Sequence, residues 1–326
     1  MKVHIPDGFV STPLNLAAAV ISTGVVAAGL HRARRRVPEH PHTVPLLATT
    51  AAFVFAAQML NFPIGGGTSG HFLGAVTAAA LLGPWNAVIV MAVVLVIQGM
   101  FFADGGITAL GTNILNMGVV GGLGGWVVMR LLRSILPAGR SAWVASAAVA
   151  SWFSVVLASA FCALELAISG TSPPEVVFPT MVGTHAVIGI GETLIAAAVL
   201  TAVAVSRPDI LPDWSGVSST PEGTGLGRRL TVFTIAGLAV ALALAVFVSP
   251  HASSHPDGLE KVAEDRGFLE KAAGEGEALW EGSPFPDYGI GGVANESVST
   301  GLAGLLGTTA VFAAGYAVIR IARRSI

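Results

Sequence analysis

The chain has 326 residues, 53% of them hydrophobic and only 11% charged, with a net charge of −2 and a mean hydropathy of +0.74. A soluble domain carries about 25% charged residues, so this composition excludes an ordinary soluble domain and indicates a protein of the lipid bilayer. The single cysteine, Cys162, excludes an internal disulfide and a thiolate metal cage, and we interpret it as a small buried side chain.

Apolar runs recur along the chain at the length of membrane-spanning helices. A hydrocarbon core of about 30 Å needs roughly 20 helical residues. The predicted fold class is an all-α integral membrane protein, a seven-segment helical bundle followed by a two-span C-terminal module. We expect long spans near residues 14–30, 44–60, 84–103, 113–132, 142–164, 181–206, 231–249 and 301–319, and a shorter apolar stretch at 71–82.

A glycine-rich break separates the second long span from the short stretch. Residues 61–70 begin with Asn61-Phe62-Pro63-Ile64, continue through several glycines and lead directly to His71. Irregular backbone at membrane depth is tolerated only where protein or a watery cavity covers it. We therefore predict a re-entrant loop that lines a site. The stretch 71–82, which Gly83-Pro84 separates from the next span, is counted as a crossing.

Arginines are distributed unevenly between the loops. If the expected spans alternate in direction, thirteen arginines share one side, and the other side keeps only Lys2, Lys261, Arg266 and Lys271. Because cytoplasmic loops carry the excess of Lys and Arg, we predict a multi-pass protein of the cell membrane. It has nine crossings, its N-terminus outside and its C-terminus in the cytoplasm. The thirteen are Arg32, Arg34, Arg35, Arg36, Arg130, Arg133, Arg140, Arg207, Arg228, Arg229, Arg320, Arg323 and Arg324.

A change of composition divides the chain into two parts. The segment 208–229 is rich in Pro, Gly, Ser and Thr and is predicted to be a cytoplasmic linker between a first membrane domain, 1–207, and a two-span module, 230–326. The outside loop of that module, 250–300, is acidic. We interpret the acidic loop as a solvated face, with weak attraction of cations as the alternative.

Polar residues gather at the predicted outer ends of the first-domain spans. Polar groups inside a membrane are costly and usually functional. Structural alternatives remain: His71 could cap a helix, Asn113 and Asn116 could join helices, and His185 could pair with Glu192, which we favour over direct ligation by either. The set comprises Gln58, Asn61, His71, Gln98, Asp104, Asn113, Asn116, His185 and Glu192.

The opening stretch Val3-His4-Ile5-Pro6-Asp7-Gly8-Phe9 places an imidazole beside the start of the chain. A terminal amine, backbone amides and a histidine ring can together chelate a transition-metal ion. Nitrogen ligands suit Ni(II), Cu(II) and Co(II), and a square-planar nitrogen set favours Ni(II) or Cu(II). We therefore predict a metal site at His4 and His71, with an ordinary terminal histidine as the alternative for His4. The other histidines, at 31, 40, 42, 251 and 255, are interpreted as solvated.

The chain shows no energy source of its own. A P-loop needs Gly-Lys followed by Ser or Thr, whereas Lys2, Lys261 and Lys271 precede Val, Val and Ala. We therefore expect that the chain is not an enzyme and that any ATP hydrolysis comes from partner subunits.

Several motifs resemble those of the CbiM/NikM family, the substrate-capture subunits of energy-coupling factor transporters for cobalt and nickel. These motifs are His4-Ile5-Pro6-Asp7-Gly8-Phe9, Gln58-Met59-Leu60-Asn61-Phe62-Pro63, Gly66-Gly67-Thr68-Ser69-Gly70-His71, 104–113 (DGGITALGTN) and 185–192 (HAVIGIGE). The segment 256–265 (PDGLEKVAED) resembles the PDGLE motif of the small NikN-like module that is often fused to this family.

This resemblance implies a metal held by the terminal amine and by the backbone amide and ring of the first histidine, here His4, together with His71. Asn61 and Asn113 would support the site. The implied partners are two cytoplasmic ABC-type ATPases and a transmembrane coupling subunit, with no nucleic acid. The family places its histidine second, whereas here it is fourth, after Met1-Lys2-Val3. Our hypothesis is that Val3 is the true start, encoded by GTG and read as Met, so that residue 3 supplies the amine.

The predicted function is uptake of Ni²⁺ or Co²⁺, the transported ion, without a separate cofactor. Nickel is favoured because the chelate suits square-planar geometry and because fused two-module forms are familiar for nickel. Cobalt uptake for cobalamin synthesis by the same mechanism is the alternative. A stand-alone cation transporter, or a metal sensor or assembly protein, would be a different class of protein.

Overall fold

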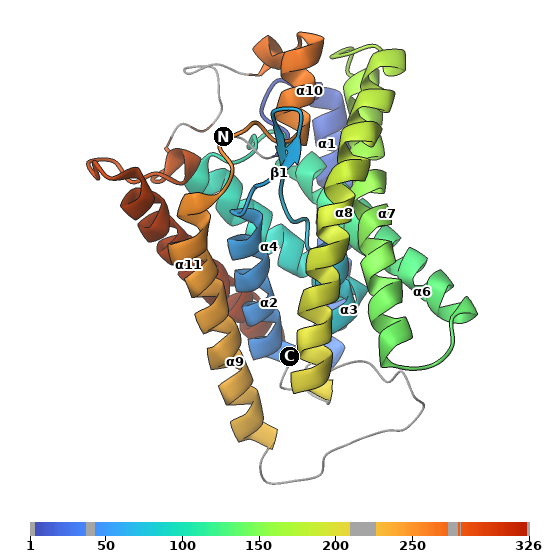
Figure 1. Ribbon diagram of the computed structural model, residues 1–326, viewed down its shortest axis with the longest axis vertical. Coiled ribbons are helices and arrows are strands. Elements are labelled where there is room, and N and C mark those ends of the chain that lie inside the picture. Colours follow the sequence, from blue (N-terminus) through green and yellow to red (C-terminus); the bar gives the residue numbers. More distant parts are fainter. Residues whose placement is uncertain (1–3, 37–42, 209–225, 273–279, 281, 325–326) are drawn as a thin grey trace.

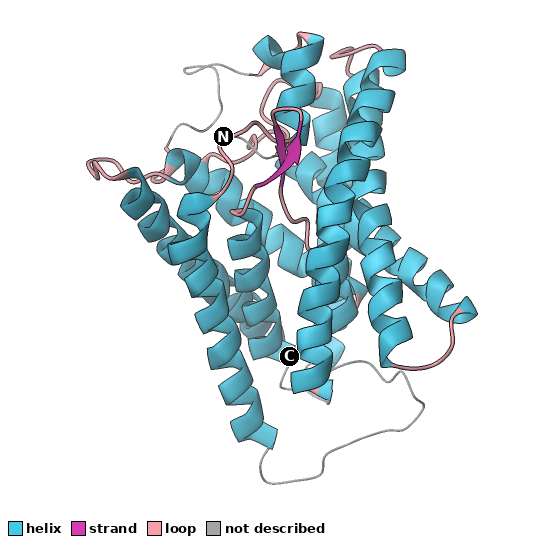
Figure 2. Cartoon of the chain, in the orientation of Figure 1, coloured by secondary structure: helices cyan, strands magenta, loops and turns pink. Residues whose placement is uncertain are grey.

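The computed structural model describes residues 4–36, 43–208, 226–272, 280 and 282–324, and these residues are almost entirely helical (Figures 1 and 2). The long helices run side by side as a bundle. The main elements are α1 (Thr12–Arg36), α2 (Thr43–Gln58), β1 (Phe62–Gly65), β2 (Thr68–Gly70), α3 (Ala75–Leu82), α4 (Pro84–Phe102), α5 (Leu110–Asn113), the π-helical η1 (Ile114–Gly124), α6 (Gly125–Ile135), α7 (Arg140–Ile168), α8 (Pro174–Ser206), α9 (Leu226–Ala243), η3 (Leu244–Val248), η4 (Ser249–His251), α10 (Gly258–Arg266), η5 (Leu269–Lys271), η6 (Pro286–Tyr288) and α11 (Glu296–Arg324).

Seven helical runs in the described chain are long and apolar enough to cross a membrane, which confirms the predicted all-α membrane fold. They are α1, α4, the continuous run from α5 through η1 to α6, α7, α8, the run from α9 to η4, and α11. Helix α2 is apolar but shorter, and most of its residues are buried. Helix α8 begins at Pro174, seven residues before the expected span, because proline is compatible with the first turn of a helix.

The glycine-rich break forms a hairpin rather than the irregular loop that we expected. Strands β1 and β2 pair antiparallel, Phe62 with Gly70 and Pro63 with Ser69. The turn between them needs glycine because Gly65, Gly66 and Gly67 all have positive φ, between 62° and 96°. The hairpin lies beside α10 at one end of the bundle (Figure 1).

The stretch 71–82 is only partly helical. Residues 71–74 have no regular secondary structure, and α3 then occupies eight residues. Gly83, with a φ of 81°, separates α3 from α4. Just beyond the far end of this stretch, the guanidinium of Arg32 stacks 3.9 Å above the ring of Trp85. Residues 71–82 thus connect the hairpin end of the bundle to its arginine-rich end.

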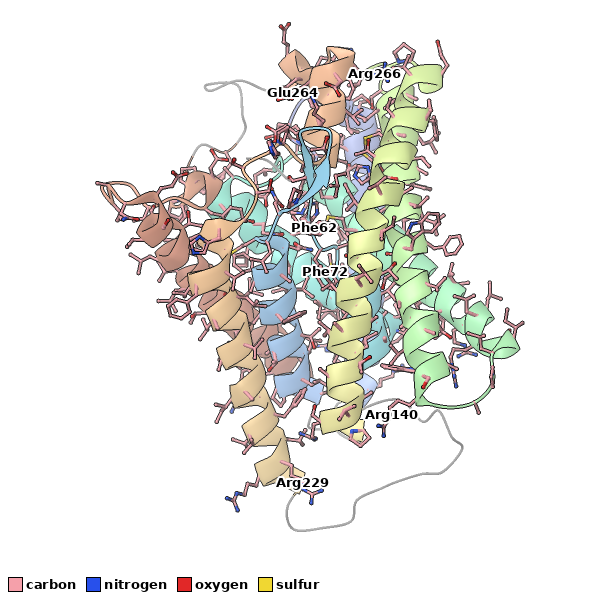
Figure 3. All side chains as sticks on the ribbon, viewed as in Figure 1. Phe62, Phe72, Arg140, Arg229, Glu264 and Arg266 are labelled. Carbon is pink, nitrogen blue, oxygen red and sulfur yellow. The ribbon has the colours of Figure 1, made fainter. Side chains whose placement is uncertain are left out.

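The two ends of the bundle carry different side chains. Figure 3 shows Arg140 and Arg229 at one end, and Glu264 and Arg266 of α10 at the other. At the arginine-rich end, Arg34 Nε donates to Ala322 O at 2.8 Å. The predicted linker, 208–229, lies largely outside the described residues.

Helix α11 of the C-terminal part packs directly on the first domain. Gly307 of α11 lies against Phe55 of α2 and Phe102 of α4 so closely that a Cβ atom there would collide with both rings. The buried residues Ala303 and Val311 belong to the same apolar cluster as Phe55. The C-terminal part is therefore held against α2 and α4, and this contact brings the loop between α9 and α11 to the hairpin end.

Candidate metal centre

The segment after residue 3 is inserted into the hairpin end of the bundle. Ile5 is buried, and its backbone is held on both sides. Its N–H donates to Asn113 Oδ1 at 3.0 Å, and its carbonyl accepts from Asn113 Nδ2 at 3.1 Å and from Gly106 N at 2.9 Å. Asn113, which we expected as a supporting residue, thus anchors the backbone next to His4.

The loop Asp104-Gly105-Gly106 provides the surface on which this segment lies. A Cβ atom at Gly106 would collide with Asp7, and one at Gly105 would lie 3.0 Å from His4 Cβ. Asp7 Oδ1 accepts from the Thr108 backbone N–H at 2.8 Å and from its hydroxyl at 2.5 Å. The glycines of this motif are therefore needed for close backbone approach.

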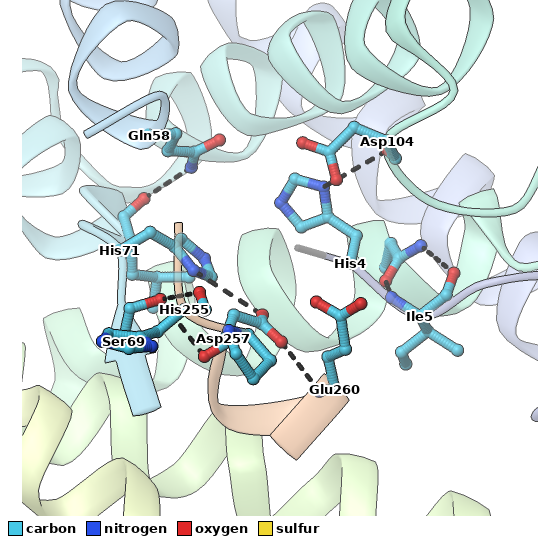
Figure 4. A network of polar contacts seen from close by, with 12 residues as sticks. His4, Ile5, Gln58, Ser69, His71, Asp104, His255, Asp257 and Glu260 are labelled. Atoms are coloured by element: carbon cyan, nitrogen blue, oxygen red, sulfur yellow. Dashed lines mark hydrogen bonds and ion pairs between the residues drawn. The ribbon is translucent and has the colours of Figure 1, made fainter. Parts of the chain in front are cut away.

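The rings of His4 and His71 meet edge to face, with centroids 5.8 Å apart and an interplanar angle of 82° (Figure 4). His4 is only 3% exposed. Its Nδ1 lies 3.3 Å from both the carbonyl and the Oδ1 of Asp104, and its Nε2 is buried with no hydrogen-bond partner in the described chain. His71 Nδ1 is likewise buried without a hydrogen-bond partner there. Two nitrogens on facing imidazoles are thus left without hydrogen bonds.

The two imidazoles differ in electrostatic environment. Burial, and then the proximity of His4, lower the pKa of His71 to about 3, so that this ring is neutral. Burial also opposes protonation of His4, but the Asp104 carboxylate and its hydrogen bonds outweigh burial and raise the pKa of His4. Metal ligation requires a deprotonated imidazole nitrogen, which His71 offers throughout the physiological range.

Glu192 holds the backbone that follows His71. This fully buried carboxylate of α8 accepts from Leu73 N at 2.7 Å and from Gly74 N at 2.9 Å. The expected pair between His185 and Glu192 is wrong, because His185 Nδ1 contacts Met181 O at 2.8 Å instead. Glu192 therefore supports the His71 loop by binding its backbone, a role that spacing along one helix could not show.

A cavity of about 80 Å³ lies next to the two histidines. His4 and His71 line it together with Asn113, Asn116 and His185, all predicted site residues. Asn116 Nδ2 donates to Glu165 Oε2 at 2.5 Å. Asn61 does not line the cavity, although it is buried and its carbonyl accepts from Ser253 N at 2.8 Å. Val3, the remaining predicted ligand, lies outside the described residues.

Two residues of the C-terminal part reach the site although sequence reasoning did not place them there. Asp257 Oδ2 lies 3.9 Å from His71 Nδ1, and the Tyr288 hydroxyl donates to Asp104 Oδ2 at 2.7 Å. Asp257 is 1% exposed, so the interpretation of the acidic loop as a solvated face is wrong for this residue. It holds for Glu264 and Asp265 of α10, which are exposed. The PDGLE motif, which contains Asp257, was the only feature of the sequence that drew attention to this part of the chain.

The Asn113 side chain offers a direct test of how the opening segment is held. Replacing Asn113 with alanine removes both hydrogen bonds to Ile5 and leaves the buried Ile5 N–H without an acceptor. Because residues that orient metal ligands typically affect affinity 10–100-fold, we expect nickel affinity to fall by about tenfold. Isothermal titration of the purified chain measures this. An unchanged dissociation constant would show that anchoring at Ile5 does not matter for the site.

The bundle and its facing pair of imidazoles define a helical membrane protein with a candidate site for a transition-metal ion. Residues 4–210 match the CbiM model, described as the cobalt uptake substrate-specific transmembrane region, and residues 231–324 match the PDGLE domain. The chain belongs to the CbiM family. It is a nickel or cobalt transport component that carries a C-terminal PDGLE domain.

Two relatives match nearly the full length of the chain. A protein of Archaeoglobus fulgidus, described as a candidate fused nickel transport protein NikMN, is 34% identical over 98% of this chain and 99% of its own. The fused nickel transport protein NikMN of Rhodobacter capsulatus is 31% identical over 95% of each chain. A solved structure of a truncated transition metal transporter, 31% identical, superposes with a TM-score of 0.54 over 62% of this chain and 98% of its own.

Proposed function

We propose that this chain captures Ni²⁺ or Co²⁺ at the outer face of the cell membrane and passes it inward as part of an ATP-driven energy-coupling factor complex. The observation that carries the proposal is the facing pair of imidazoles, His4 buried and His71 partly buried, each with a buried nitrogen free of hydrogen bonds, beside a cavity. Two cytoplasmic ATPases and a transmembrane coupling subunit supply the energy.

The ligand set favours transition metals over the abundant hard cations. Mg²⁺ and Ca²⁺ prefer oxygen ligands, whereas neutral imidazole suits Ni(II), Co(II), Cu(II) and Zn(II). In this proposal, His4 and His71 bind the ion directly, and the amine of residue 3 completes the nitrogen set if the mature chain begins there. Intact-mass analysis of metal-loaded protein tests the last point, because retention of Met1-Lys2 would rule out the amine chelate.

The orientation of the site follows from charge. Cytoplasmic loops of membrane proteins are enriched in Arg and Lys, and the end of the bundle that carries Arg140 and Arg229 lies opposite α10 (Figure 3). We therefore place the arginine-rich end in the cytoplasm and the histidine pair at the outer side, where the ion arrives.

Nickel is the proposed physiological ion, because two full-length relatives are described as fused nickel transport proteins. Cobalt is the second candidate, because the matching family model is described as a cobalt uptake region. Competition between the two radioactive ions for uptake into cells distinguishes them.

Uptake in a host that lacks its own nickel and cobalt transporters tests the proposed mechanism. We expect accumulation of radioactive nickel when this chain is expressed with the ATPases and the coupling subunit. We expect none when the ATPase subunits carry inactive nucleotide sites. Equal uptake with inactive ATPases would instead favour a stand-alone cation transporter.

A further inference from the structure

The C-terminal PDGLE part reaches both histidines of the candidate metal centre, His71 through Asp257 and His4 through Tyr288 and the intervening Asp104. We propose that this part completes the metal centre: Asp257 contributes a carboxylate oxygen next to His71, and Tyr288 positions His4 through Asp104. This inference rests on the proposed function, in which His4 and His71 bind the transported ion. It assigns to the PDGLE motif a direct effect on ion affinity.

Asp257 is placed where a carboxylate can reach an ion on His71. Its Oδ1 caps α10 by accepting from Glu260 N at 2.8 Å, while its Oδ2 faces His71 Nδ1 at 3.9 Å (Figure 4). This second distance is too long for a hydrogen bond. Two ligand atoms that each lie about 2 Å from one ion are separated by up to about 4 Å, so the spacing fits an ion shared by the carboxylate and the imidazole.

The turn that carries Asp257 is fixed to the hairpin that carries His71. Ser69 N donates to Pro256 O at 2.8 Å, and Ser69 Oγ donates to His255 O at 2.8 Å. Gly258 packs against His185 so closely that a Cβ atom there would lie 2.9 Å from the ring. The first turn of α10 therefore forms one wall of the cavity and is joined to the His71 hairpin by hydrogen bonds.

The first turn of α10 also packs against the opening segment of the chain. Leu259 belongs to one buried apolar cluster with Ile5 and Phe9, and it lines the cavity together with Gly258. Ile5 directly follows His4, so the PDGLE turn packs beside the segment that carries His4 as well as beside the hairpin that leads to His71.

Tyr288 acts on the other histidine through one intermediate residue. Its hydroxyl donates to Asp104 Oδ2 at 2.7 Å, and Asp104 Oδ1 lies 3.3 Å from His4 Nδ1. The Tyr288 ring stacks on Phe102 with centroids 4.8 Å apart, which fixes the position of the hydroxyl. The Asp104 carboxylate beside Nδ1 restricts the orientation of the His4 ring, and the Tyr288 hydroxyl in turn fixes that carboxylate. Tyr288 is therefore a positioning residue.

Conservative variants separate this role from simple packing. Asparagine caps a helix as well as aspartate does, so Asp257→Asn removes the charge and keeps α10 capped. Tyr288→Phe removes only the hydroxyl. The matched controls are Glu264→Gln, an exposed carboxylate on the same helix, and Tyr316→Phe, whose hydroxyl accepts from Arg320 Nη1 at 3.0 Å in α11.

The test is titration of the purified full-length chain in lipid nanodiscs with NiCl₂ and with CoCl₂. We expect Asp257→Asn to weaken affinity by about 10–100-fold and Tyr288→Phe by about tenfold, the usual range for residues that support metal ligands. Both variants should also shift the visible absorption of bound Co²⁺, which a purely structural role would leave unchanged. The controls should stay within about twofold of the wild-type chain.

A parallel titration of His71→Ala separates failure of this inference from failure of the proposed function. If His71→Ala loses the ion while Asp257→Asn and Tyr288→Phe bind it like the wild-type chain, with the same Co²⁺ spectrum, the role of the C-terminal part is refuted and the histidine site stands. If His71→Ala itself binds normally, the proposed function fails, and this inference fails with it.

Discussion

Replacing His71 with alanine is expected to abolish high-affinity binding of nickel and cobalt and to leave the fold intact. The substitution removes one of two facing imidazoles, whose ring centroids lie 5.8 Å apart. Loss of a residue that merely supports a ligand typically costs 10–100-fold in metal affinity, so loss of a ligand should cost at least about a hundredfold. Isothermal titration of the purified chain with NiCl₂ measures the effect.

The control for this variant is His251→Ala. His251 is exposed at the end of η4, in the same region of the molecule, and should bind no ion. Circular dichroism should show the same helix content for both variants, because the His71 ring forms no helix cap in the structure. Wild-type affinity in His71→Ala would rule out this imidazole as a ligand.

The second large effect is expected for Glu192→Ala, which should lower both stability and metal affinity. The carboxylate accepts two backbone N–H groups directly after His71, and alanine would leave both without a partner in a buried region. A buried unsatisfied donor costs about 1–3 kcal/mol, so the free energy of unfolding should fall by about 2–6 kcal/mol. Thermal unfolding of the metal-free chain in detergent measures the loss of stability.

Two further variants define the cause of the Glu192 effect. Glu175→Ala removes an exposed carboxylate from the first turn of the same helix and should leave both stability and affinity unchanged. Glu192→Gln keeps one acceptor oxygen and should lie between the wild-type chain and the alanine variant. A fully stable Glu192→Ala protein with wild-type nickel affinity would show that the His71 loop does not depend on this carboxylate.

Much of the fold followed from the spacing of apolar residues. Spans such as 84–103 and 142–164 correspond to α4 and α7 because a run of about 20 apolar residues has few alternatives in a bilayer. The break at Gly83-Pro84 also separates α3 from α4 as expected. The conformation of segment 61–70 was harder to predict. Its glycines allow the positive φ angles that the structure shows, but glycines of this kind occur both in hairpin turns and in irregular loops.

The sequence motifs predicted that His4 and His71 belong to one site, but they did not predict which residues position these two side chains. Asp257 and Tyr288 follow His71 by nearly two hundred residues or more, and only the packing of α11 on α2 and α4 brings their loop to the site. Glu192 shares a helix face with His185, yet it binds backbone from a different element. Contacts of this kind depend on tertiary packing, which periodicity along one helix does not encode.

The central claim is that the opening histidine and His71 together hold the ion. Anomalous diffraction from crystals of the full-length chain grown with nickel tests it most directly. We expect one strong anomalous peak between the rings of His4 and His71, within bonding distance of a nitrogen on each. A nickel peak elsewhere in the bundle, with both rings free of metal, would contradict it.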